Sequence, residues 1–312
     1  MSSAALVLGL DVGATRVRAA AARGFEILVT RSATWPAGLT PEAEADFVAD
    51  TALRALHEAA PGAYACAAGV ALAALTDDDG RVVAWPNRPN WAGLPLRARL
   101  EARLGLTVRV EDDANAAALG EWRLGNGRGY TSGLVMTVGT GVGAGLVLDG
   151  QLWRGRHGWA GELGHVIVQP GGPECACGRR GCVQALASGR GLDRLAREHG
   201  LGGGEDLAAA AERGETWAHE ALVECGRWLG LGAANAVTLL DLEVVIVGGA
   251  LGRLGAPFWP ALEASLHANL PQPEARGVAL LRALLGAGAG LVGALGLALE
   301  LAARAVPQEV AS

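Results

Sequence analysis

The sequence predicts an α/β protein built from two related halves. Apolar runs of strand length alternate with helical stretches rich in Ala and Leu along the 312 residues. One device, an apolar strand followed by a glycine turn and a second strand, occurs at Gly13 and again at Gly139, 126 positions later. The length also suggests two domains, at about 100–200 residues each. We therefore expect a duplicated architecture with a ligand bound between the halves.

The first half opens on two strands joined by a tight turn. An apolar run at 5–10 stops at Asp11, apolar alternation resumes at Val17, and another strand is expected at 25–29. Residues 40–42 supply the N-cap, proline and acidic residue that typically start a helix, which should reach about residue 60. The remaining expected elements are a strand within 64–75, a turn at 77–80, a Pro/Asn loop at 86–95, a helix at 96–104, a strand at 108–110 and a helix at 114–124.

The second half repeats the strand, glycine turn and strand with which the first half opens. An apolar run at 132–138 precedes a glycine turn, and Asp149-Gly150 is typical of a hairpin. Beyond an irregular segment at 158–182 we expect mostly helices, with one further strand at 244–247 and a final helix at 290–305. Residues 283–299 carry no charge. Since a membrane span needs about 20 apolar residues, we expect this stretch to be a buried helix against a glycine-lined surface.

Composition excludes several mechanisms. All 26 basic residues are arginines, and the absence of Lys removes Walker A loops, protein-kinase chemistry and Schiff-base enzymes. A net charge of -6 with scattered arginines argues against nucleic acid as a partner. The N-terminal segment lacks the basic start of a secretory signal. We expect a cytoplasmic protein that has no membrane partner.

The two glycine turns are candidate phosphate sites. A strand that ends in such a turn presents backbone N–H groups, which bind phosphate oxygens without a cation. Asp11 could hold a hydrated Mg²⁺ ion, and Thr15 and Thr140 offer hydroxyl groups. Ordinary hairpin turns would show the same short motif. The second turn, together with Gly248-Gly249 at the end of a third strand, favours phosphate binding.

Three adjacent acids, Glu111, Asp112 and Asp113, stand between a strand and a helix. Helix capping explains one of them and stabilises by about 1 kcal/mol. Because side chains alternate along a strand, Asp112 and Asp113 should point in different directions. One carboxylate could then accept the proton of a substrate hydroxyl during phosphoryl transfer. The residues alone leave both interpretations open.

A cysteine cluster predicts a metal site. His165, Cys175, Cys177 and Cys182 make a Cys₃His set with no open position, which indicates structural zinc rather than catalytic zinc. A group of reduced thiols without metal is the alternative.

Glu162, close to the cluster, is a candidate ligand-binding residue, whereas the two remaining cysteines are not expected to bind metal. Glu162 precedes His165 by three residues, and a polyhydroxyl ligand could be held between the two side chains. Cys66 and Cys225 are isolated and should be buried small apolar residues.

Together these motifs resemble the ROK family of bacterial sugar kinases, and its glucokinase-like members in particular, over nearly the whole chain. Residues 11–15 resemble the family's DxGGT phosphate turn, and 137–143 its second phosphate turn. Pro86-Asn87 ahead of Trp91 resembles its PN…W segment, and 112–121 its N-D-A-N-A-A-A-x-G-E stretch. Residues 160–165 and 175–182 resemble the zinc signature, and Gly248-Gly249 the adenosine-side glycine pair.

The resemblance implies an α/β protein of the actin-like ATPase (ribonuclease H-like) fold, with two α/β domains around a central cleft. Residues 1–119 would form the small domain, completed by a helix at 294–312, and 120–293 the large domain with its zinc loop. The implied reaction is ATP-dependent phosphorylation of a hexose at its 6-hydroxyl, as in glucokinases, with Mg²⁺ accompanying ATP. Homodimers or homotetramers are typical of the family.

The resemblance also assigns roles to residues. Asp113 would be the general base, and the zinc ligands would be His165, Cys175, Cys177 and Cys182. The sugar would be bound by Asn87, Asp112, Asp113, Glu162, His165 and Gln184. ATP and its phosphates would be bound by Asp11, Gly13, Ala14, Thr15, Thr137, Gly139, Thr140, Gly141, Gly248 and Gly249.

Several positions depart from the family pattern. Asp112 replaces the usual Asn before the catalytic Asp, Gln184 replaces a sugar-contacting Glu, and Ala14 replaces the second Gly of the first turn. Residues 71–74 replace a G-x-P-G segment. The alternatives to a glucokinase are therefore a kinase for another hexose or N-acetylhexosamine, and a catalytically weak sugar-binding sensor. Regulators of the family carry a DNA-binding segment ahead of the first turn, which starts here at residue 11, so we expect no such segment.

Overall fold

The computed structural model describes residues 4–305, which form two compact units. Unit 1 contains the described residues up to Leu124, the segment Arg154–Ala160 and the residues from Ala287 onward. Unit 2 contains Gly125–Trp153 and Gly161–Gly286. A helix was expected at 294–312, and its part from 306 to 312 lies outside the described residues.

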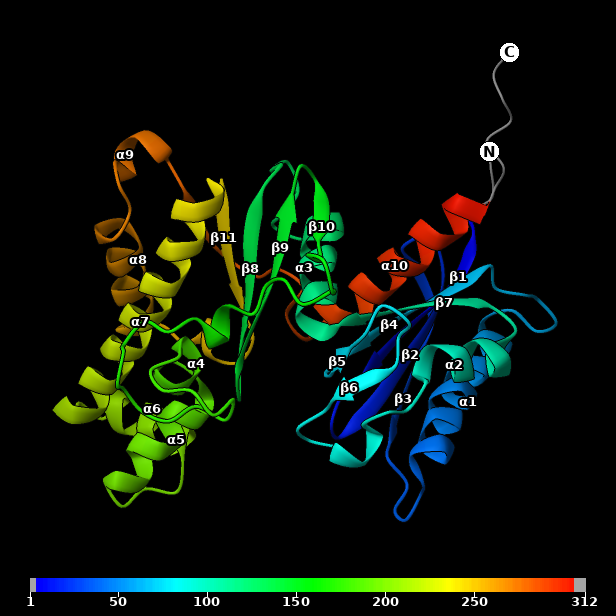
Figure 1. The fold of residues 1–312 in the computed structure, drawn as a ribbon, viewed down its shortest axis with the longest axis horizontal. Helices are drawn as coiled ribbons and strands as arrows, with labels where there is room; N and C mark the ends of the chain where they lie inside the picture. The colour runs from blue at the N-terminus through cyan, green and yellow to red at the C-terminus, as the bar shows by residue number, and fades with distance from the viewer. Residues whose placement is uncertain (1–3, 306–312) are drawn as a thin grey trace. The chain divides into compact units, whose positions relative to one another are not determined.

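Unit 1 is built on a five-stranded mixed sheet with the order β3-β2-β1-β4-β7 (Figure 1). Its strands are β1 (Leu6–Val12), β2 (Arg16–Arg23), β3 (Glu26–Thr34), β4 (Ala67–Leu72) and β7 (Thr107–Asp112). A two-stranded sheet contains β5 (Leu75–Thr76) and β6 (Val82–Ala84). The helices are α1 (Pro41–Ala59), η1 (Pro89–Trp91), α2 (Leu96–Leu104), α3 (Asp113–Leu124), η4 (Gly286–Gly288, at the boundary of the units) and α10 (Ala289–Ala305).

Unit 2 contains a second five-stranded mixed sheet, with the order β10-β9-β8-β11-β12. Its strands are β8 (Gly133–Val138), β9 (Val142–Leu148), β10 (Gln151–Trp153), β11 (Val244–Gly248) and β12 (Ala279–Arg282). Its helices are η2 (Leu163–His165), α4 (Val183–Leu186), α5 (Gly189–Glu198), α6 (Gly204–Glu212), α7 (Thr216–Leu240), η3 (Leu251–Arg253), α8 (Phe258–Ala268) and α9 (Pro273–Arg276).

The two sheets share one topology, which confirms the expected duplication. In each, the first three strands in chain order form an antiparallel meander, and the last two strands join in parallel beside the first. Asp149 and Gly150 both have positive φ, at 52° and 71°, which suits the tight hairpin turn between β9 and β10. Each glycine turn joins the first strand of its sheet to the second.

The sheet of unit 1 is covered on both faces. Because side chains alternate along β1, its residues contribute to the cores on both sides. Leu8 and Leu10 belong to the core shared with α1, whereas Val7 packs with Leu295 of α10 on the opposite face. Thr40 caps α1 by accepting a hydrogen bond from the backbone N–H of Ala43, at 3.3 Å, as the sequence signal indicates.

Helix α10 packs against glycines, as expected for the uncharged stretch. A Cβ atom at Gly9 of β1 would lie 2.8 Å from the Leu295 side chain, and one at Gly69 of β4 would overlap the backbone at Ala294. The stretch Gly286–Ala305 is long and apolar enough to span a membrane by length and composition, but half of it is buried inside the structure. A core helix of a folded domain has these same properties.

Three expectations about local structure were wrong or incomplete. Strand β12 was not foreseen, because it has only four residues, three half-buried and one exposed, and runs directly into the uncharged stretch that follows. Strand β6, with only three residues, was also missed. Cys66 is exposed rather than buried, because it lies in the loop just before β4, whereas Cys225 is buried in α7 as expected.

Candidate active site

The first glycine turn follows directly from the end of β1. The backbone N–H of Gly13 donates to the carbonyl of Arg16 at 3.1 Å, which closes the turn, and Thr15 is exposed. Ala14 is not among the described residues with positive φ. A glycine's conformational freedom is therefore not needed at this position, and the departure from the family pattern is structurally tolerated.

Asp11 lies at the end of β1 with its carboxylate paired to Arg18 on the neighbouring strand β2. The side chain of Asp11 is 17% exposed. Arg18 also donates to the carbonyl of Ala287, at 2.5 Å, just before α10 begins. The guanidinium thus balances the charge of the carboxylate predicted to hold Mg²⁺.

The second glycine turn also follows the first strand of its sheet, but its closing hydrogen bond spans two residues rather than three. The N–H of Gly139 donates to the carbonyl of Gly141 at 2.9 Å, Thr140 is exposed, and Thr137 is half-buried at the end of β8. Gly249 follows β11 with a φ of 81°, and a Cβ atom there would collide with the backbone of Val138. The predicted adenosine-side pair Gly248-Gly249 therefore lies against the strand that leads into this turn.

Gln184, predicted to bind sugar, supports the second turn in this structure. Its side-chain oxygen accepts a hydrogen bond from the N–H of Val142 at 3.0 Å. The same oxygen lies so close to Gly141 that a Cβ atom there would be 2.5 Å away. Gln184 is therefore positioned beside the second glycine turn rather than extended into solvent.

The three adjacent acids have separate surroundings. Glu111 is 1% exposed and pairs with Arg154 at 2.5 Å and Arg109 at 3.6 Å. Asp112 caps α3 by accepting hydrogen bonds from the N–H groups of Ala114 and Asn115, at 2.9 and 3.3 Å. Asp113 is the first residue of α3, and its side chain is exposed.

The loop ahead of η1 carries Asn87, which is exposed, while Trp91 at the end of η1 is fully buried. The buried indole anchors the loop in the core of unit 1.

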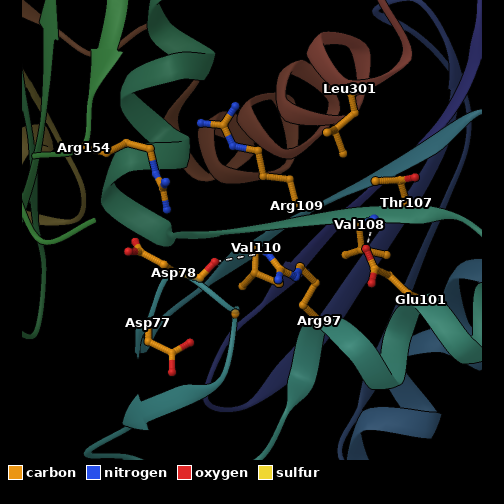
Figure 2. A pocket seen from close by; sticks show the side chains of 11 residues that line it. Asp77, Asp78, Arg97, Glu101, Thr107, Val108, Arg109, Val110, Arg154 and Leu301 are labelled. Atoms are coloured by element: carbon orange, nitrogen blue, oxygen red, sulfur yellow. Dashed lines mark hydrogen bonds between the residues drawn. The ribbon is translucent and has the colours of Figure 1, made fainter. Parts of the chain in front are cut away.

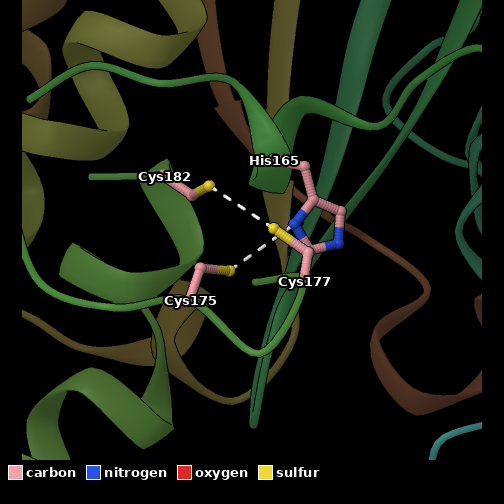
Figure 3. A group of neighbouring side chains, drawn as sticks. All are labelled: His165, Cys175, Cys177 and Cys182. Atoms are coloured by element: carbon pink, nitrogen blue, oxygen red, sulfur yellow. Dashed lines mark hydrogen bonds between the residues drawn. The ribbon is translucent and has the colours of Figure 1, made fainter. Parts of the chain in front are cut away.

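The Cys₃His cluster assembles in unit 2 (Figure 3). One ligand atom from each of His165, Cys175, Cys177 and Cys182 lies within 4.8 Å of all the others. The Sγ atoms of Cys177 and Cys182 are 3.7 Å apart, and Cys175 Sγ lies 3.6 Å from His165 Nδ1. Tetrahedral zinc with ordinary bond lengths requires sulfur–sulfur and sulfur–nitrogen separations of about 3.8 and about 3.6 Å. The four side chains can therefore hold a metal ion.

The thiol groups of the cluster differ in pKa. Burial opposes ionisation of Cys177, but hydrogen bonds from the backbone and side chain of Arg179, with those of the neighbouring thiols, lower its pKa to about 6. Burial and the neighbouring Cys177 and Cys175 raise the pKa of Cys182 to about 12. A nearby guanidinium thus favours the thiolate at the exposed end of the cluster.

His165 presents its two ring nitrogens to different neighbours. Nδ1 faces Cys175, whereas Nε2 lies 3.8 Å from the Oε2 atom of Glu162. This separation exceeds a hydrogen bond, and a hydroxyl oxygen lying beside the line that joins the two atoms could reach both. Glu162 is 53% exposed, so a ligand can reach it.

The predicted residues are divided between the units. Unit 1 contains the first turn with Asp11, the loop of Asn87, and the pair Asp112 and Asp113. Unit 2 contains the second turn, the adenosine-side glycines, Glu162, Gln184 and the Cys₃His cluster.

A polar pocket of about 310 Å³ lies beside β7 in unit 1 (Figure 2) and is lined by none of the predicted residues. Its charged groups already have partners: Glu101 accepts from the N–H of Val108, and Arg97 donates to the carbonyl of Asp78. Figure 2 shows both contacts at the pocket wall. The pocket therefore offers little unsatisfied polarity to a ligand.

Sequence reasoning missed the residues that surround the first turn, namely Arg18, Trp35, Glu44 and Arg88. These residues do not belong to a periodic sequence pattern, and Arg88 lies in the expected Pro/Asn loop, where no local pattern indicates a role. The only available signal was an arginine directly after Asn87.

Comparison with known proteins gives several relatives of equal identity. The chain is 35% identical to a glucokinase from Streptomyces coelicolor over 316 residues, covering 95% of this chain and 98% of that protein. It is also 35% identical to a kanosamine kinase from Amycolatopsis mediterranei, with 96% and 98% covered. An N-acetylmannosamine kinase from Salmonella typhi matches at 35% identity, with 92% and 96% covered.

Solved structures agree with these relatives. A ROK hexokinase from Thermus thermophilus superposes with a TM-score of 0.88 at 35% identity, covering 96% of this chain and 99% of that one. A ROK family glucokinase from Streptomyces griseus, in complex with glucose and AMPPNP, gives 0.76 at 35% identity, with 95% and 99% covered. The fold is that of the actin-like ATPases, as expected. The family model described as ROK family matches residues 7–301, and this chain belongs to that family.

Proposed function

We propose that this protein is an ATP-dependent hexose kinase that transfers the γ-phosphoryl group to the 6-hydroxyl of glucose. The observation that carries the proposal is the pair of glycine turns, each at the end of the first strand of its sheet, in a chain 35% identical to a glucokinase. Both turns present backbone N–H groups of the kind that bind phosphate oxygens.

Asp113 is proposed as the general base. Among the three adjacent acids, Asp113 is the exposed member and the first residue of α3, at the position that the family resemblance gives to the base. A carboxylate within reach of the sugar hydroxyl would accept its proton as the phosphoryl group is transferred.

Glu162 and His165 are proposed to bind sugar hydroxyls. A hydroxyl between Nε2 of His165 and Oε2 of Glu162 would accept from the imidazole and donate to the carboxylate. Metal binding at Nδ1 would fix the proton on Nε2, which makes it a donor.

Zinc is the proposed metal of the Cys₃His cluster, because three sulfurs and one imidazole at these separations suit its tetrahedral preference. The four ligands leave no open position, so the ion would shape the sugar-binding segment. Mg²⁺ would arrive with ATP, and Asp11 would supply the single carboxylate that such sites commonly use.

The competing proposal concerns the sugar. The kanosamine and N-acetylmannosamine kinases match this chain at the same 35% identity as the glucokinase. Gln184 at a position usually held by a charged residue also permits a different hydroxyl or amino substituent.

A coupled ADP-release assay would test the proposal. It should compare glucose, mannose, fructose, allose, kanosamine, N-acetylglucosamine and N-acetylmannosamine at equal concentration with Mg-ATP. We expect glucose to give the highest kcat/KM. A higher value with an amino or N-acetyl sugar would support the competing substrate, and no turnover with any sugar would leave a sugar-binding sensor.

A further inference from the structure

The carbonyl groups of both glycine turns are held by hydrogen-bond donors, at equivalent positions. In unit 2 the carbonyls of Gly139 and Thr140 accept from the backbone N–H groups of Gly189 and Arg190, at 2.8 and 3.3 Å. These two donors belong to the first turn of α5. The second phosphate turn is therefore fixed by the start of a helix.

In unit 1 two side chains do the same. The carbonyl of Gly13 accepts from the indole N–H of Trp35 at 3.0 Å, and the carbonyl of Ala14 accepts from Arg88 Nη2 at 3.3 Å. Gly13 and Ala14 follow the end of β1 as Gly139 and Thr140 follow the end of β8. An indole and a guanidinium thus replace the helix N-terminus of unit 2.

Holding these carbonyls determines where the turn's donors point. A peptide group is planar, and its C=O and the following N–H point in opposite directions. Fixing the carbonyls of Gly13 and Ala14 therefore fixes the N–H groups of Ala14 and Thr15. Ala14 and Thr15 are among the residues that the family resemblance assigns to ATP and its phosphates.

Arg88 is itself held rigidly. Its guanidinium pairs with Glu44 of α1, a carboxylate that is 5% exposed and also accepts from the indole N–H of Trp91. The guanidinium also stacks on Trp35, with its Cζ atom 4.1 Å from the ring centroid. The two donors to the turn thus support each other, and a buried charge anchors both.

We infer that Trp35 and Arg88 are positioning residues for the ATP phosphate turn, and that Arg88 links this turn to the adjacent loop residue Asn87. The inference rests on the proposed kinase function. The indole N–H of Trp35 donates to the turn itself, so its loss should affect ATP, while its ring packs against Phe47 and Trp91. Arg88 donates to the turn and follows Asn87 in the chain, so its loss should affect both ATP and sugar.

The test compares W35F, R88M and the control R81M. Phe keeps the ring under the guanidinium but lacks the N–H. Arg81 also lies in unit 1, and its guanidinium donates to the carbonyl of Gly93, at 2.6 Å, rather than to the turn. The measurements are KM for ATP and for the sugar, kcat, and the affinity for a non-hydrolysable ATP analogue by calorimetry.

W35F should raise KM for ATP several-fold and leave KM for the sugar within two-fold. R88M should raise both about ten-fold, as expected for the loss of one charge-assisted hydrogen bond. R81M should change neither. Should R88M alone fail to fold because Glu44 is left buried and charged, the double variant E44Q/R88M removes that charge.

Analogue affinities of W35F and R88M within two-fold of the unsubstituted protein would overturn the inference. This readout needs no turnover. A protein that binds the analogue but phosphorylates no sugar would therefore refute the kinase proposal while still testing the positioning roles.

Discussion

Three consecutive carboxylates have different surroundings, namely those of Glu111, Asp112 and Asp113. The first is buried between two arginines, the second is bound by two backbone N–H groups, and the third is exposed at a helix start. Strand alternation and the transition from β7 to α3 separate the three side chains. Repulsion among three adjacent acids is thereby avoided.

Substitution of Asp113 tests its proposed role at this scale. D113N should lower kcat by about 10²- to 10⁴-fold, the usual contribution of a general base, with a smaller change in KM. Steady-state kinetics of the purified variant would measure this. D79N removes an exposed carboxylate elsewhere in unit 1 and should leave kcat unchanged. A kcat for D113N within ten-fold of the unsubstituted enzyme would exclude the base role.

Glu243 offers a pH-dependent contribution to stability. Hydrogen bonds from the N–H groups of Ser132 and Thr131, and from the Thr131 hydroxyl, lower the pKa of its carboxyl group. A group with a lowered pKa stabilises the fold above its unfolded value of about 4.3, and this stabilisation disappears as the pH falls through the folded pKa.

E243Q should therefore have a lower Tm than the unsubstituted protein at pH 7, and the difference should shrink as the pH falls below about 4. Thermal melts across this range would measure it. A Tm difference that stayed constant with pH would show that charge at Glu243 makes no contribution.

At the scale of elements, α10 packs where glycines bring backbones together. Gly293 of α10 faces the backbone of Ala116 in α3, and Gly120 of α3 faces the backbone around Ala289. The contact is reciprocal, since each helix supplies a glycine to the other. Such close packing leaves no space for a methyl group at either position.

G293A should destabilise the protein by about 1–3 kcal/mol or more, because the added methyl group must displace backbone. G288A is the matched control, since a Cβ atom at Gly288 meets no atom within 4 Å. Urea unfolding of both variants would give the two free energies. Equal stability of G293A and G288A would mean that α10 can shift without cost.

The elements that sequence patterns predicted best are those with strong local signals. The cap and proline at the start of α1, the Asp149-Gly150 hairpin and both glycine turns carry their signals within a few residues. Strand β12 does not, because a four-residue edge strand is defined by pairing with β11 rather than by its own pattern. Pairing between distant segments cannot be read from a local window.

The functional site follows the same rule across the whole molecule. Motif residues such as the Cys₃His set lie close in sequence, and the structure brings their ligand atoms together. Trp35, Glu44 and Arg88 come from three separate segments and meet only through tertiary packing. Local motifs thus predicted the groups proposed to touch ligand, but not those that hold them in place.

Metal analysis tests the molecule as a whole. We expect about one zinc ion per chain, and C177S should lower both zinc content and Tm, since structural zinc contributes directly to folding. C66S, at an exposed isolated cysteine, should retain full zinc. Zinc removal should raise KM for the sugar more than KM for ATP, because His165 belongs to the cluster. Protein that contains no zinc after expression in zinc-supplemented medium would contradict the assignment.

The packing of α10 against Gly9 and Gly69 has a consequence for the synthesis of the chain. The strands of unit 1 that carry Gly9 and Gly69 leave the ribosome first, yet the helix that covers them comes from residues 289–305. Between these segments the ribosome must produce nearly all of unit 2, whose sheet and helices come from a largely continuous stretch of chain. The half that is translated before unit 2 is therefore completed after it, because the part of its sheet around Gly9 and Gly69 is covered only when residues 289–305 have been made.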